Sequence, residues 1–396
     1  MSNQLAGYSL IALLIILCVP TLQNLFYEQS KVWLRQVEPY KSSQMTGLMQ
    51  LLSVMGDGEF FFYMIIAVCY GRGKTYDYCY LSTCFILNYH WGNMLKQALH
   101  HSRPQFDDPT LAHENYGDCA SEFGNPSGHM LATTQFFITL ILFYKDKNPT
   151  FFKDNQWVSM LLKGSCFVIV LLMGFSRWYL GRHSIDQIII GAMLGALSAH
   201  FFFYCMKPHM FDPVFHPDFP QLPAAKLWDY FLTSAILCGL LIGQVVSIYI
   251  YVEKFVQIPA AWTENMLKIC SDVKLTEKFH YNNCAIEGYM VIFPAHYFWK
   301  AFQNSEVGKK MYIDTSNLKS SRVPVTETLF KIALVIAADF LVSDFIPLTF
   351  FGTKDLDLMS DFIFKRVLTS LFLSAVALSP IDNLVQKLFR TPYSKQ

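Results

Sequence analysis

The sequence has few charged residues and almost no net charge. It contains 31 Lys and Arg and 30 Asp and Glu, which together make up 15% of the chain and leave a formal charge of +1. An average soluble protein carries roughly 25% charged residues. Nucleic-acid binding needs a clear basic surplus, so we expect no nucleic-acid partner.

The cysteines show no metal-binding pattern. None of the ten forms a Cys-x-x-Cys pair, and no spacing of the zinc type is present. The cysteines therefore indicate no metal site, and no cofactor is expected. Cys119, Cys270 and Cys284 lie in polar segments, and they could form disulfides if those segments face an oxidising lumen.

Apolar residues are abundant, at 53% of the chain with 16% aromatic. They gather in runs long enough to cross a bilayer, so the sequence predicts an all-α, multi-pass transmembrane helical bundle. The first run lacks a preceding basic region and is expected to be a retained span. Six spans are expected in the first half: 8–26, 45–70, 78–95, 126–144, 158–175 and 188–205.

The second half adds about four spans, which would place both termini on one side of the membrane. The runs are 228–252, 286–302, 329–350 and 362–378, of which the second contains Pro294 and His296 and is the weakest. The distribution of Lys and Arg outside the spans favours cytosolic termini. Lys309, Lys310 and Lys387 support this orientation, and Lys365 and Arg366 oppose it.

Three polar blocks stand at the ends of apolar runs, at residues 96–104, 124–129 and 176–187. The first follows the third span, the second opens the fourth, and the third links the fifth to the sixth. With one crossing per span, all three blocks lie on the same face of the membrane. The sequence therefore predicts one site, on the face opposite the termini.

The first block contains Lys96 and Arg103, seven residues apart. On a continuing helix they would share a face, and Pro104 would then end the helix. A guanidinium presents a planar fork to two phosphate oxygens, and an ammonium adds a point charge. The alternative is a basic anchor at the membrane boundary, where such side chains are common.

The second block, Pro126-Ser127-Gly128-His129, opens an apolar helix. Free backbone N–H groups and the positive end of the helix dipole would make an anion site here. His129 is placed to act as a general acid toward a leaving oxygen. The alternative is an ordinary helix start with a histidine at the boundary.

The third block supplies a second guanidinium, Arg177, and a second histidine, His183. Asp186 and Gln187 follow one helical turn after His183. A hydrogen bond from either to one ring nitrogen would fix the tautomer and leave the other nitrogen as a nucleophile. The residues alone do not decide between the two.

Together the blocks resemble the signature of the type 2 phosphatidic acid phosphatase superfamily, which shares its helical core with vanadium haloperoxidases. That signature is Lys-x6-Arg-Pro, then Pro-Ser-Gly-His, then Ser-Arg-x5-His-x3-Asp. Gln187 stands where the pattern has aspartate. Glucose-6-phosphatases are similar in having glutamine there and in the spacing Cys-x4-Gly-x-Pro-Ser-Gly-His, which begins here at Cys119. The resemblance covers roughly residues 45 to 205.

The resemblance implies a six-helix phosphatase core over residues 1–206 and a C-terminal transmembrane extension of unknown role over 207–396. It implies a metal-free hydrolysis of a phosphomonoester, in which His183 forms a phosphohistidine and His129 protonates the leaving alcohol. Asp186 or Gln187 would orient His183. The phosphate oxygens would be held by Lys96, Arg103, Ser127, Gly128 and Arg177.

The substrate implied by the resemblance is a sugar phosphate such as glucose 6-phosphate, or a lipid phosphate in the membrane. The expected location is the endoplasmic reticulum or another endomembrane, with a lumenal active site and cytosolic termini. An alternative is a catalytically silent membrane scaffold, since Gln187 departs from the signature and the second half matches nothing. A transporter is less favoured, because the charged residues stand at helix ends and not in mid-membrane.

Overall fold

The computed structural model describes residues 19–72, 74–111, 122–215, 222–269, 287–311, 323–342, 361–378 and 380–389. The chain forms two compact units that interleave along the sequence. The first comprises residues 1–61, 88–205 and 248–283, and the second comprises 62–87, 206–247 and 284–396. Cys119, Cys270 and Cys284, the candidates for disulfides, lie outside the described residues.

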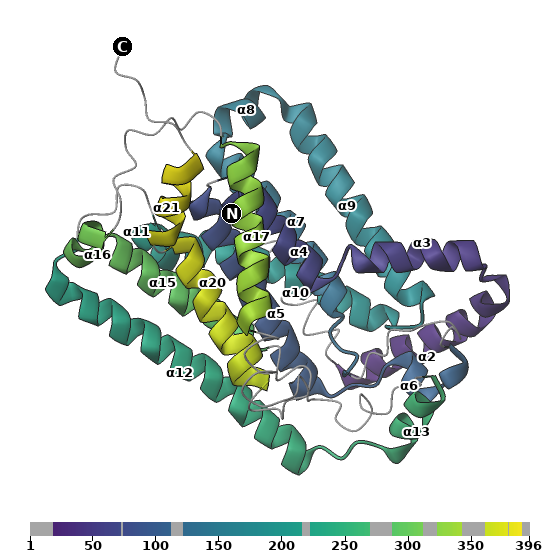
Figure 1. The fold of residues 1–396 in the computed structure, drawn as a ribbon. Coiled ribbons are helices and arrows are strands. Elements are labelled where there is room, and N and C mark those ends of the chain that lie inside the picture. The colour runs from purple at the N-terminus through teal and green to yellow at the C-terminus, as the bar shows by residue number, and fades with distance from the viewer. Residues whose placement is uncertain are drawn as a thin grey trace. The chain divides into compact units, whose positions relative to one another are not determined.

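The described residues of both units are helical, which confirms the all-α prediction (Figure 1). The first unit holds α2 (Pro20–Val37), α3 (Ser43–Val54), α6 (Pro104–Asp107), α7 (Gly128–Lys147), α8 (Pro149–Asp154), α9 (Gln156–Tyr179), α10 (Ile185–Phe201) and α13 (Ala260–Ile269). The second holds α11 (Asp212–Phe215), α15 (Ile292–Gln303), α16 (Glu306–Met311), α17 (Val325–Phe340), α20 (Leu368–Leu378) and α21 (Pro380–Phe389). Three helices contribute to both, namely α4 (Gly58–Ile65), α5 (Thr75–Leu99) and α12 (Ala224–Phe255).

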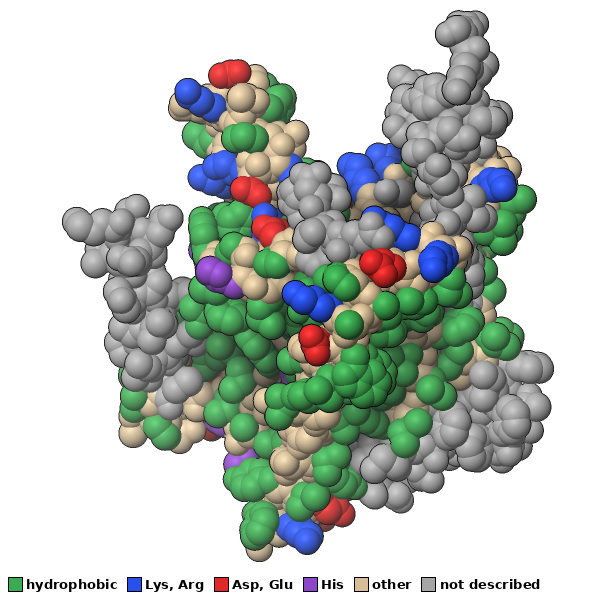
Figure 2. Space-filling view, turned by 90° about the vertical axis from the view of Figure 1, so that its left-hand side faces the viewer, with side chains coloured by type: hydrophobic (Ala, Val, Ile, Leu, Met, Phe, Trp, Pro, Cys, Tyr) green, Lys and Arg blue, Asp and Glu red, His purple; other side chains and the backbone are tan. Residues whose placement is uncertain are grey.

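Three helical stretches among the described residues are long and apolar enough to cross a membrane: Gln156–Tyr179, Ile185–Phe215 and Ala224–Phe255. They correspond to three of the predicted spans. The first keeps only 6% of its most apolar window buried within the protein, and it exposes Met160 and Phe167. A helix that is apolar all round and exposed needs lipid around it. Figure 2 shows a face on which hydrophobic side chains predominate. The chain is a membrane protein.

One helix lies outside the expected spans, and one expected span is broken. Residues 28–37, which follow the first expected span, form most of α2. This helix buries polar residues such as Gln23 and Ser30 and exposes Leu25 and Trp33, so its pattern does not look like that of a soluble helix. The expected span at 45–70 is broken after α3, and α4 begins at Gly58, next to Asp57.

The first unit is built on α7 and α10, which pack along each other. Glycines on α10 allow the close approach: a Cβ at Gly191 would lie 2.7 Å from the Ser127 carbonyl oxygen, and one at Gly195 would lie 2.5 Å from that of Leu131. Helix α9 packs against both, and α3 packs against α9. This arrangement brings the beginnings of α7 and α10 together with the end of α9.

The second unit pairs α15 with α20, and α17 packs against α20 and α21. It buries a Lys331–Glu327 ion pair within α17, with both side chains 0% exposed. The Lys331 ammonium lies 5.0 Å from the centre of the Tyr70 ring, a cation–π contact. The predicted division of the chain at residue 206 stays a prediction.

Candidate active site

The three polar blocks meet in the first unit, around the carboxylate of Glu122. Lys96 Nζ lies 2.5 Å from Glu122 Oε2, and Arg103 Nη2 lies 2.8 Å from Glu122 Oε1. The Lys96 and Arg103 side chains are 3% and 0% exposed. Two buried cations therefore share one carboxylate, which is how buried charges are normally compensated.

Lys96 and Arg103 do not share one helix face, so that prediction was wrong. Helix α5 ends at Leu99, and His100 has a positive φ of 36° that breaks the helical path. Arg103 then caps α6, where Pro104 takes the first position and begins the helix instead of ending one. The two side chains converge because the chain turns between them.

Arg103 also connects the first block to the third. Its Nε donates to the Glu122 carbonyl at 2.8 Å, and its Nη1 donates to the Arg182 carbonyl at 3.3 Å. The same Nη1 lies 3.4 Å from His183 Nε2. The guanidinium is thus fixed by backbone carbonyls beside the ring of His183.

The His183 ring is held through its Nδ1 atom, which lies 2.9 Å from the Gly124 carbonyl oxygen and 3.2 Å from Gln187 Oε1. A backbone carbonyl can only accept, so Nδ1 carries the proton and Nε2 keeps its lone pair. Burial, followed by the nearby Arg103 and Arg177, lowers the pKa of His183 well below 6.5. The ring is therefore neutral at physiological pH, with Nε2 toward Arg103.

Gln187, and not Asp186, makes the contact with His183. Gln187 Oε1 also accepts from the Ser184 N–H at 3.3 Å, and its Nε2 donates to the Ser102 carbonyl at 2.6 Å. One backbone donor and one backbone acceptor therefore fix which end of the amide is oxygen. Asp186 is 0% exposed, and no hydrogen bond joins its carboxylate to His183 in the described part of the chain.

Gly124 is required where Gln187 and Ser102 approach. A Cβ at this position would lie 2.6 Å from the Ser102 carbonyl oxygen and 2.7 Å from Gln187 Nε2. Real Cβ atoms do not come so close to other heavy atoms. The Gly124 N–H donates to the His101 carbonyl at 2.8 Å. This backbone hydrogen bond joins the first block to the start of the second.

The second block begins α7 at Gly128, two residues after Pro126. The Ser127 N–H donates to the Gln187 carbonyl at 3.1 Å, which joins the second and third blocks. The Ser127 hydroxyl is buried and has no hydrogen-bond partner among the described residues. A Cβ at Gly128 would lie 3.3 Å from Lys96 Nζ, so the lysine ammonium lies against the first turn of α7.

His129 follows on this first turn and is half-buried. Its ring lies close to Gly56, where an added Cβ would be 3.3 Å from His129 Cδ2. Arg177, at the end of α9, donates from Nη1 to the Ser53 hydroxyl of α3. The Ser176 hydroxyl donates to the Met49 carbonyl at 2.7 Å, so α3 holds the end of α9 in place.

The electrostatics of the cluster favour an anion. Burial would raise the pKa of the Glu122 carboxyl, but the Lys96 ammonium and the Arg103 guanidinium outweigh it and hold the pKa at about 2. Arg177 and Arg182 are also buried, at 5% and 3% exposure. Four cationic side chains, those of Lys96, Arg103, Arg177 and Arg182, therefore lie near the single carboxylate of Glu122.

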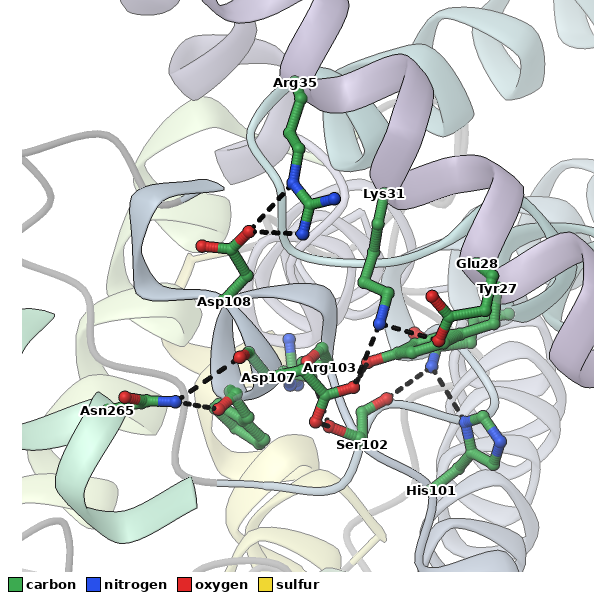
Figure 3. A network of polar contacts seen from close by, with 12 residues as sticks. Tyr27, Glu28, Lys31, Arg35, His101, Ser102, Arg103, Asp107, Asp108 and Asn265 are labelled. Carbon is green, nitrogen blue, oxygen red and sulfur yellow. Dashed lines mark hydrogen bonds and ion pairs between the residues drawn. The ribbon is translucent and has the colours of Figure 1, made fainter. Parts of the chain in front are cut away.

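A second layer of polar contacts supports the first block (Figure 3). Asp107 accepts from the Ser102 hydroxyl and the Tyr27 hydroxyl, both at 2.8 Å, and Arg35 of α2 binds Asp108 at 2.7 Å. Asn265 of α13 donates to the Phe106 carbonyl at 2.8 Å. Helices α2 and α13 therefore fix α6, and with it Arg103, from the outside.

Sequence reasoning missed several contributors to the site. Glu122 stands between the first two blocks, and Ser53 lies on α3 outside all three. Ser102, Gly124 and Arg182 lie inside the first, second and third blocks, but their roles had not been predicted. The one available signal was Glu122, an acid two residues before the second block. No group of three His, Cys, Asp or Glu is placed to hold a metal among the residues that the structure describes.

Comparisons with known proteins find a family domain in the part of the chain that holds this site. Residues 77–211 match the model of the PAP2 superfamily. Phosphatidylglycerophosphatase B from Bacillus subtilis is 28% identical over 169 residues, which cover 40% of this chain and 72% of that protein. Dolichyldiphosphatase from Saccharomyces cerevisiae is 24% identical over 137 residues, which cover 33% of this chain and about half, 52%, of that protein.

A solved structure was also found, that of a transmembrane PAP2-type phosphatidylglycerolphosphate phosphatase from Bacillus subtilis. It covers 51% of this chain and 96% of its own, with a TM-score of 0.43 and 20% identity. The predicted resemblance to this superfamily is confirmed for residues 77–211, the region that matches the family model. The predicted likeness to glucose-6-phosphatases is not confirmed by these relatives and stays a prediction.

Proposed function

We propose that this membrane protein, which carries a PAP2 superfamily domain over residues 77–211, is a metal-independent phosphatase that acts through a phosphohistidine. The observation that carries the proposal is the state of His183. Its Nδ1 is held by the Gly124 carbonyl, and its Nε2 faces Arg103 at 3.4 Å. A neutral, oriented imidazole beside a guanidinium is suited to attack a phosphorus atom whose oxygens are bound by cations.

In the first step, the Nε2 lone pair of His183 forms a bond to phosphorus, and the bond from phosphorus to the leaving alcohol oxygen breaks. His129, which must be protonated for this step, gives its proton to that oxygen. In the second step, water attacks phosphorus, its proton passes to His129, and the phosphorus–nitrogen bond breaks. Nε2 regains its lone pair and inorganic phosphate leaves, so the histidines return to their starting states.

The phosphoryl oxygens are held by charge and by hydrogen-bond donors. Lys96, Arg103 and Arg177 supply the charge. The Ser127 hydroxyl, which has no partner among the described residues, and the Gly128 N–H supply donors at the start of α7. The structure already holds Lys96 and Arg103 beside the start of α7, so these groups can stabilise the transition-state charge with little movement of their own. Gln187 acts as a positioning residue for His183, in the role that the sequence left open between it and Asp186.

The proposed substrate is a lipid phosphate. The two relatives are named for a phospholipid phosphate and a polyprenyl diphosphate, which supports a lipid substrate over the sugar phosphate that the sequence also allowed. The proposed site faces away from the cytosol, in the endoplasmic reticulum or another endomembrane. Its support is the one-sided placement of the three blocks and the distribution of Lys and Arg.

The test is phosphate release by detergent-purified protein in the presence of EDTA. Phosphatidylglycerophosphate, phosphatidate, a polyprenyl diphosphate and glucose 6-phosphate are offered in parallel. We expect release from a lipid that His183→Ala abolishes and that vanadate blocks. His200→Ala is the matched control, because His200 lies exposed on α10 outside the site. No release from any substrate would instead favour the silent scaffold.

A further inference from the structure

Glu122 occupies the position between Lys96 and Arg103 that a phosphate would need. Its two carboxylate oxygens are divided between the cations, with Oε2 at 2.5 Å from Lys96 Nζ and Oε1 at 2.8 Å from Arg103 Nη2. Two oxygens of a phosphoryl group bind an arginine and a lysine in the same way. The Glu122 side chain is 30% exposed, whereas those of Lys96 and Arg103 are 3% and 0% exposed, so Glu122 is the most accessible of the three.

The position of His183 makes the overlap unavoidable. Its Nε2 is 3.4 Å from Arg103 Nη1. When Nε2 attacks a phosphorus atom, the oxygens on that phosphorus will therefore lie next to the Arg103 guanidinium. Arg103 Nη2 is already bound to Glu122, and Nε is bound to the Glu122 backbone carbonyl. The substrate phosphate and the Glu122 carboxylate therefore compete for the donors of Arg103 and Lys96.

We propose that the Glu122 carboxylate is a built-in competitor for the phosphate site, displaced when substrate binds and returning when phosphate leaves. The inference rests on the proposed function only in placing the phosphate beside His183. Displacement costs two charge-assisted contacts, which weakens the binding of every phosphate ligand. The returning carboxylate restores those contacts and expels the product, so product inhibition is weak.

A purely structural Glu122 makes the opposite prediction. If the carboxylate only held Lys96 and Arg103 in place, its loss would let the cations move and would weaken phosphate binding. If it competes, its loss strengthens binding. The sign of the change in affinity separates the two roles.

The variant is Glu122→Gln, which keeps the shape of the side chain and removes its charge. We expect KM and the inhibition constant for inorganic phosphate to fall together by about tenfold or more, the worth of one charge-assisted contact. The rate at saturation should not rise. Asp154→Asn, which removes a charge from an exposed position at the end of α8, should change neither constant.

Direct binding of inorganic phosphate, measured calorimetrically in the His183→Ala background, tests the inference without turnover. There Glu122→Gln should bind phosphate more tightly than the parent, and Glu122→Asp, which keeps the charge on a shorter side chain, should fall between them. Weaker, unchanged or absent phosphate binding in Glu122→Gln would overturn the inference. If Glu122→Gln does not fold, equal phosphate affinity of Glu122→Asp and the parent would overturn the inference. Failure of the proposed function would appear separately, as no phosphate release by the parent enzyme.

Discussion

Replacement of Gln187 by glutamate tests the account of how His183 is held. The substitution keeps the length of the side chain and exchanges the Nε2 donor for a second acceptor oxygen. In the structure, Nε2 donates to the Ser102 carbonyl at 2.6 Å and lies 3.4 Å from His101 Nδ1. Gln187→Glu would therefore bring two acceptor oxygens together at a position that is 0% exposed.

The magnitude follows from what is lost. One buried hydrogen bond disappears, and the Ser102 carbonyl is left without its donor; such a loss costs about 1–3 kcal/mol. The introduced carboxyl has a raised pKa because it is buried against an acceptor. An acid whose pKa is raised on folding destabilises the protein above that pKa and ceases to do so below its unfolded value, about 4.3.

The assay is thermal unfolding in detergent at neutral and acidic pH, together with phosphate release. We expect Gln187→Glu to be less stable than the parent at pH 7 by about 1–3 kcal/mol, and the difference to shrink toward pH 4.5 as the carboxyl is protonated and donates to Ser102. The His183 tautomer should be retained, because the Gly124 carbonyl and one carboxylate oxygen still accept from Nδ1, so phosphate release should persist in the variant that remains folded. Asp186→Asn, at the neighbouring buried carboxyl, should not show this recovery in acid. Equal stability of Gln187→Glu and the parent at pH 7 would refute the assignment of the amide.

Two further predictions concern the same ring. Gly124→Ala should lower phosphate release at least tenfold. Its Cβ would lie 2.6 Å from the Ser102 carbonyl oxygen and would displace the Gly124 carbonyl that orients His183. Gly164→Ala is the control and should leave release unchanged, because nothing lies within 4 Å of an added Cβ there. Because the pKa of His183 is lowered well below 6.5, kcat/KM corrected for substrate ionisation should show no loss of activity from this group as pH falls through 6.5. A protonation step at pH 6.5 or above that is traced to His183 would contradict the burial and charge described for the ring.

The sequence was sufficient to predict the cluster because each block stands at a helix end. Block spacing along apolar runs placed Lys96, His129 and His183 on one face, and the structure brings the blocks together within the first unit. The same reasoning failed for Arg103, where a left-handed His100 redirects the chain after α5. A helical spacing rule contains no information about such a turn.

The remaining features of the site depend on tertiary contacts that have no local signature. The backbone carbonyl of Gly124 orients His183. Every residue has such a carbonyl, so the residue type at position 124 does not indicate this role. The choice between Asp186 and Gln187 depends on the direction in which α10 begins, which Ser30 of α2 helps to fix by accepting from the Ile185 N–H at 2.9 Å. Glu122 acquires its place only because two distant cations converge on it.

The most direct test of the central claim is to trap the phosphorylated enzyme. Purified protein is mixed with a lipid phosphate labelled in its phosphoryl group, quenched in alkali, which preserves phosphohistidine, and digested for mass spectrometry. The account predicts a phosphoryl group on His183, absent from His183→Ala and retained in His200→Ala. Rapid phosphate release with no label on His183, or with the label on another residue, would contradict it.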